Sequence, residues 1–86
     1  MDYSKYIIVD YGVFEQAIMF SNVIAHADFL KMFPKDQIVS AGFFDVGTDK
    51  SGNITVSVFG KSTTLQLGTR ENDNILLKKA LRKSII

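Results

Sequence analysis

Residues Gln37 to Leu67, QIVSAGFFDVGTDKSGNITVSVFGKSTTLQL, decide the fold of this chain. The middle segment, Asn53 to Phe59, alternates apolar and polar residues, which is the period of a half-buried strand. Turns at 49–52 and 60–61 flank it, and each contains a glycine that can supply the positive φ of a hairpin turn. The stretch therefore predicts three consecutive strands joined by two tight turns.

A glycine and two phenylalanines lie in the first strand of this meander. Gly42 within a strand predicts a bulge or a close approach of another backbone. Phe43 and Phe44 are adjacent, so they point to opposite faces of the sheet. One of them is expected in the core. The other needs a cover, which could be the second helix, a partner chain or a ligand.

The residues before the meander predict a hairpin followed by a helix. A β-branched run at 5–10 is joined by a turn at 10–12 to a second strand at 13–20. Ala, Glu and Met in the second segment would also suit a helix, but the tight turn favours a hairpin. Ser21 or Asn22 can cap the following helix, which Pro34 ends. This helix could begin as late as residue 26.

A second helix is predicted at the end of the chain. Thr69 or Asn72 can cap it, and acidic residues in its first turn suit the helix dipole. Its inner stripe consists of Leu77, Ala80, Leu81 and Ser84. The order β-β-α-β-β-β-α over residues 1–86 then predicts one α+β domain. We expect a mostly antiparallel sheet of about five strands with two helices packed on one face.

Composition limits the classes of function. The chain has 86 residues and no cysteine, so disulfides and thiolate metal sites are excluded. It lacks the basic and apolar regions of a signal peptide and any apolar run long enough to cross a bilayer. We expect a soluble protein of the cytoplasm with no membrane partner. The apolar content of 47% and the exposed sheet edges also predict a homodimer.

Two motifs resemble ligand-binding loops but fail on detail. The segment 60–63, GKST, has the end of a phosphate-binding loop, but position 55 is threonine and a strand follows instead of a helix. The segment 49–54, DKSGNI, resembles a calcium loop, but its first and twelfth ligand positions would be Gly47 and Val58. Neither of these supplies a side-chain oxygen. We interpret both segments as hairpin turns and predict no cofactor.

The sequence contains no clear catalytic or metal-binding set. His26 is the single histidine, and a zinc site would need carboxylates gathered from elsewhere in the chain. No serine stands in a strand–turn–helix elbow of the Gly-x-Ser-x-Gly type. We therefore predict that His26 is a capping or hydrogen-bonded structural residue and that the protein is not an enzyme.

Aromatic and basic residues are the candidates for binding. Contact with a protein partner is predicted for five aromatic residues, which are Phe43, Phe44, Tyr3, Tyr6 and Tyr11. The chain is net negative over 1–50 and net positive over 51–86. The last helix carries two like-charge i, i+4 pairs, formed by Lys78, Lys79, Arg82 and Lys83. These four could bind RNA while aromatic side chains stack on its bases, although lysines at a helix C-terminus also occur simply because the dipole favours them.

Three segments carry a family resemblance. They are VSAGF at 39–43, FGKSTTL at 59–65 and GTREND at 68–73. Together they resemble small uncharacterised accessory proteins of tailed bacteriophages, which have an Ala-Gly-Phe strand, a Gly-x-Ser-x-Ser-Leu strand and a Ser-Arg-x-x-Asp helix start. Thr64 and Thr69 replace two of the serines. The resemblance brings no catalytic residue.

The resemblance implies a phage or prophage accessory role in the host cell. Such short proteins commonly bind and block a host factor. The leading hypothesis is therefore a non-enzymatic inhibitor of a host or defence protein. The alternative is an RNA-binding module that uses the basic last helix and exposed aromatic residues.

Overall fold

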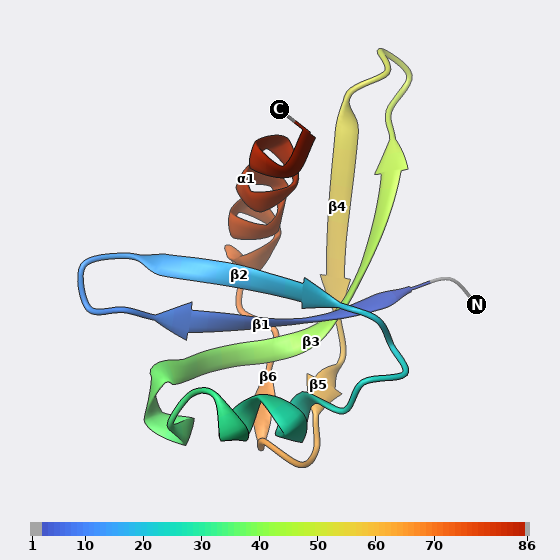
Figure 1. The fold of residues 1–86 in the computed structure, drawn as a ribbon. Helices are drawn as coiled ribbons and strands as arrows, with labels where there is room; N and C mark the ends of the chain where they lie inside the picture. The colour runs from blue at the N-terminus through green and yellow to red at the C-terminus, as the bar shows by residue number, and fades with distance from the viewer. Residues whose placement is uncertain (1–2, 86) are drawn as a thin grey trace.

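The computed structural model describes residues 3–85, and it describes side chains as far as residue 82. Its main sheet has four antiparallel strands in the order β2-β1-β3-β4, and a separate two-stranded ribbon is formed by β5 and β6 (Figure 1). The elements in chain order are β1 (Ser4–Asp10), β2 (Glu15–Phe20), the 3-10 helices η1 (His26–Lys31) and η2 (Lys35–Gln37), β3 (Ile38–Thr48), β4 (Ile54–Phe59), β5 (Lys61–Ser62), β6 (Leu67–Gly68) and α1 (Asp73–Ile85). The predicted α+β class and mostly antiparallel sheet are confirmed.

The predicted pair of helices on one face is wrong. Between β2 and β3 the chain forms two short 3-10 helices. Phe29 of η1 packs on the sheet face opposite to α1, whereas η2 has no buried residue. Ser21 does not cap a helix, because its hydroxyl accepts the N–H of Val23 only two residues ahead and holds a local turn. Ala25, which precedes η1, provides no side-chain cap. Pro34 then separates η1 from η2, because a proline disfavours helical geometry at the residue before it.

The third strand of the predicted meander is also wrong. The hairpin of β3 and β4 forms as predicted, with Gly52 at a φ of 84° in its turn. At Gly60, with a φ of 75°, the chain leaves the main sheet instead of returning along it. The two residues of β5 then pair with β6 across a turn, in which Gln66 has a φ of 57°. The ribbon replaces a fifth strand of the sheet.

Two hydrophobic clusters sandwich the sheet. On the α1 face, Tyr6 and Ile8 of β1 pack with Leu77 of the helix. On the opposite face, Ile7 and Val9 pack with Leu65 from the ribbon turn and with partly buried aromatic residues of the η1 region. All four β1 residues are fully buried, because elements cover both sides of this central strand. Strand β1 is thus the centre of the whole core.

Gly42 lies where two backbones approach closely, as predicted. A Cβ atom at this position would lie 2.7 Å from Cγ2 of Thr69 and 2.9 Å from the carbonyl oxygen of Phe59. The bulge in β3 is elsewhere. Ile8 pairs with Ser40 and Val9 pairs with Ile38, so the extra residue is the one between them, Val39.

The two adjacent phenylalanines divide between the faces. Phe44 lies in the core beside α1. Phe43 is partly buried on the other face, so the last helix does not cover it as expected, and neighbouring rings of the chain itself supply part of its cover. Its ring centroid lies 5.2 Å from that of Tyr3, 5.5 Å from that of His26 and 5.9 Å from that of Phe59. This follows from the register, since Phe59 is opposite Phe43 on β4.

A buried carboxylate fixes the start of α1. Asp73 is fully buried and its Oδ2 accepts a 2.6 Å hydrogen bond from the hydroxyl of Tyr6. The same carboxylate accepts bonds from the backbone N–H and the Nε of Arg70. The guanidinium of Arg70 also makes a two-pronged contact with Glu15, at 2.8 Å and 3.2 Å. The network joins α1 to β1 and β2, and it holds the helix across one face of the sheet.

Candidate functional site

His26 is buried and is held by a hydrogen bond and by contacts with aromatic rings. Its Nε2–H donates a 2.9 Å hydrogen bond to the carbonyl oxygen of Gly42, and its ring contacts those of Phe20 and Phe43 edge to face. Burial lowers the pKa of His26, and the positive charge of Lys5 lowers it further. The predicted hydrogen-bonded structural histidine is confirmed.

The segments 49–54 and 60–63, which resemble ligand-binding loops in sequence, contribute to turns in the structure. The carboxylate of Asp49 accepts bonds from the backbone N–H groups of Ser51 and Asn53, and these bonds lower the pKa of Asp49. The hydroxyl of Ser62 accepts the N–H of Leu65, and a turn follows it. Within the described residues no group of three or more His, Cys, Asp or Glu side chains is placed to hold a metal ion.

The five aromatic residues predicted to contact a partner do not form one surface. Tyr6 and Phe44 are buried in the core under α1, so the expected exposure of Tyr6 is wrong and Phe44 is the phenylalanine of the pair that enters the core. Burial and the bond to Asp73 raise the pKa of the Tyr6 hydroxyl above its usual value. Tyr3 and Phe43 are partly buried against one another on the opposite face. Of the five, Tyr11 alone is classed as exposed, with 42% of its surface accessible.

An exposed apolar patch surrounds Tyr11 at the turn between β1 and β2. We call it the hairpin patch and define it as Tyr11, Val13 and Phe14. The rings of Tyr11 and Phe14 stack at 5.1 Å, and Phe33 meets Tyr11 edge to face at 6.2 Å. Val13 is 91% exposed and Phe14 is 54% exposed. The sequence prediction missed Val13 and Phe14, although their position beside a tight turn indicated exposure.

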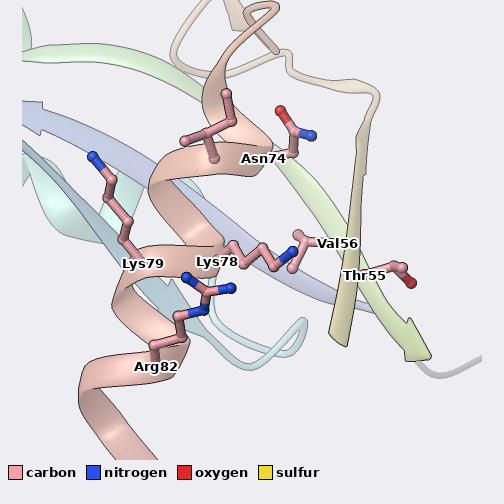
Figure 2. A pocket seen from close by; sticks show the side chains of 7 residues that line it. Thr55, Val56, Asn74, Lys78, Lys79 and Arg82 are labelled. Carbon is pink, nitrogen blue, oxygen red and sulfur yellow. The ribbon is translucent and has the colours of Figure 1, made fainter. Parts of the chain in front are cut away.

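The basic residues of α1 border a groove between this helix and β4. Lys78, Lys79 and Arg82 line it from the helix, and Thr55 and Val56 line it from the strand (Figure 2). The groove encloses about 430 Å³. Lys78 extends toward Val56, whereas Lys79 extends to the other side of the helix. Lys83, the fourth predicted residue, lies beyond the described side chains.

These basic side chains have few acidic neighbours. Over residues 3–82 the recorded ion pairs join Arg70 to Glu15 and to Asp73, and they do not involve Lys78, Lys79 or Arg82. Asp49, at the tip of the β3–β4 hairpin, is near enough for the charge of Lys78 to contribute to its lowered pKa. The groove therefore has a net positive charge.

The basic groove and the partly exposed aromatic cluster lie on opposite faces of the sheet. Phe43 packs with His26 from η1, whereas its neighbour Phe44 packs under α1. The residues that line the groove, which include Asn74 and Ile75, contain no aromatic side chain among those described. A bound strand of RNA would have to pass around the edge of the sheet at β4 to contact the basic helix and stack its bases on Phe43 or Tyr3.

Comparison with protein-family models, with curated proteins and with solved structures found no match to this chain. No helix in the described part of the chain is long and apolar enough to cross a membrane.

The lowered pKa of His26 makes stability depend on pH. The unfolded chain, with an ordinary histidine pKa of 6.5, binds a proton more readily than the folded chain. The free energy of unfolding should therefore fall as the pH drops below about 6.5. Urea unfolding at pH 7.5 and pH 5.5 measures this loss. His26→Gln should show a smaller loss over the same interval, and an equal loss in both proteins would contradict the assignment.

Proposed function

We propose that this chain is a small, non-enzymatic, phage-type accessory protein that binds and inhibits a host or defence protein in the cytoplasm of the host cell. The observation that carries the proposal is the hairpin patch, which places an exposed aromatic pair beside an almost fully exposed valine. The resemblance of three segments to small phage proteins supports the biological setting.

The chemistry of the hairpin patch suits a protein partner. Aromatic side chains are enriched in protein interfaces, where they bury a large area at a small cost in conformational entropy. Tyr11 and Phe14 already stack on each other, and Phe33 supports Tyr11 from η1's C-terminal side. The rings are therefore ordered before a partner arrives, which lowers the entropic cost of binding.

A homodimer belongs to the same proposal. The strand order leaves β2 with one free edge, and a second copy could add its own β2 there. Light scattering at high protein concentration should then give the mass of two chains. The mass of one chain would contradict the dimer without affecting the proposed contact with a host protein.

A charge within the hairpin patch should abolish capture of the partner. Val13→Asp introduces a carboxylate at a position that is 91% exposed, so the fold is retained while an apolar contact is lost. Val23→Asp is the matched control, because Val23 is 86% exposed in the loop at the other end of the β1–β2 hairpin (Figure 1).

The measurement is a pull-down from ribonuclease-treated host lysate with the wild type and both variants. We expect one host protein to be captured by the wild type and by Val23→Asp, and to be reduced at least about tenfold with Val13→Asp. Equal capture by all three proteins would contradict a role for the hairpin patch.

RNA binding is a second candidate function. It is favoured by one observation, that Lys78, Lys79 and Arg82 all line one groove without an acidic side chain in ion-pair contact among those described. Contact would be with the phosphate backbone, since the groove offers no described aromatic ring for stacking.

RNA binding of this kind should weaken steeply with salt. Phosphate contacts release counterions, so the affinity for an oligouridine should fall at least about tenfold between 50 and 200 mM salt. Replacing Lys78, Lys79, Arg82 and Lys83 by alanine should abolish the binding. Binding that persists in this variant would reject the groove as the RNA site.

A further inference from the structure

The groove beside α1 also borders a free sheet edge. Strand β4 is the last strand in the order β2-β1-β3-β4, so one of its edges has no neighbouring strand. A free edge presents backbone N–H and C=O groups that can pair with an extended peptide. Thr55 and Val56 of this strand line the groove opposite the basic face of α1. Backbone pairing groups and positive charges therefore occur together.

We propose that an acidic, extended segment of a partner protein adds to β4 as a fifth strand and places its carboxylates against Lys78 and Arg82. This contact is separate from the hairpin patch, so either site can fail in experiments without affecting the other. The proposal defines the chemistry of the partner, which is an extended chain with acidic residues at every second position.

The repeat distances of helix and strand agree with this arrangement. Lys78 and Arg82 are four residues apart, so they are separated by about 6 Å along α1. Alternate residues of an extended peptide are about 6.6 Å apart and lie on one face. The helix contacts β4 and runs alongside it (Figure 1). Carboxylates at every second position of the added strand would thus meet successive turns of the helix.

The lining of the groove favours a peptide over RNA. Ile75, which is 51% exposed, and Val56, which is 9% exposed, both line the groove, and both suit an aliphatic or hydroxyl side chain better than a phosphate. RNA would leave the unpaired groups of β4 without backbone partners. The described lining also has no aromatic ring on which a base could stack.

The probe is a fluorescent octapeptide of alternating Glu and Thr. When extended, this peptide has all four carboxylates on one face. A control octapeptide with four Glu followed by four Thr has the same composition but divides its carboxylates between the two faces. Two further controls keep the alternating sequence and are N-methylated at either the odd or the even positions. At least one of them blocks pairing with the strand edge while its charge is unchanged.

Two double variants are compared, and each reverses the charge of two basic residues at a different place in the protein. Lys78→Glu with Arg82→Glu alters the groove. Lys31→Glu with Lys35→Glu makes the same change in charge at exposed positions of η1 and η2, which do not line the groove. Urea unfolding of both variants verifies that each is folded.

Fluorescence anisotropy gives the affinities. We expect the alternating peptide to bind the wild type and the Lys31/Lys35 variant alike, and to bind the Lys78/Arg82 variant at least about tenfold more weakly. The block peptide and one N-methylated peptide should also bind at least about tenfold more weakly. Three results would overturn the proposal. The alternating peptide could fail to bind, or all the peptides could bind equally. Oligouridine could also displace the alternating peptide at a lower concentration than the unlabelled alternating peptide needs to displace it.

Discussion

The hydrogen bond between the Tyr6 hydroxyl and the Asp73 carboxylate is the interaction on which the rest of the structure depends. Both residues are fully buried, and they join the central strand to the first residue of the α-helix. A buried carboxylate without partners is costly, so the chain must keep Tyr6 and Arg70 in place around it. Arg70 extends the network to Glu15 on β2. Helix α1 is thereby held against the sheet at its N-terminal end.

This placement of α1 determines what the surface offers. With the helix over one face, the η1 region and the ribbon must cover the other, and the two hydrophobic clusters form on either side of β1. The helix then stands beside β4, and its basic residues border the free edge of that strand. The hairpin patch lies at the far end of β1 and β2, where the turn extends beyond the core (Figure 1). The two surfaces that we propose for binding therefore lie apart in the same fold.

The four strands of the main sheet and the last helix were predictable, whereas the segment between β2 and β3 and the ribbon of β5 and β6 were not. Alternation over 53–59 and the turns at 10–12 and 49–52 fix the strands locally. The chain leaves the main sheet at Gly60, and Gly42 admits Thr69 and the Phe59 carbonyl at close range, a contact between residues distant in sequence. The burial of Tyr6 likewise depends on α1, and the partial cover of Tyr11 depends on Phe33. The alternation of residues along a strand reveals neither of these contacts. The basic set was predictable because i, i+4 spacing is local.

A double-mutant cycle on Tyr6 and Asp73 tests this dependence most directly. Urea unfolding would compare the wild type, Tyr6→Phe, Asp73→Asn and the double variant. We predict that Tyr6→Phe alone lowers the free energy of unfolding by about 1–3 kcal/mol, because it removes a donor from a buried carboxylate. We also predict a coupling energy of about 1 kcal/mol or more between the two sites. Losses that simply add, to within about 0.5 kcal/mol, would contradict the central role of this hydrogen bond.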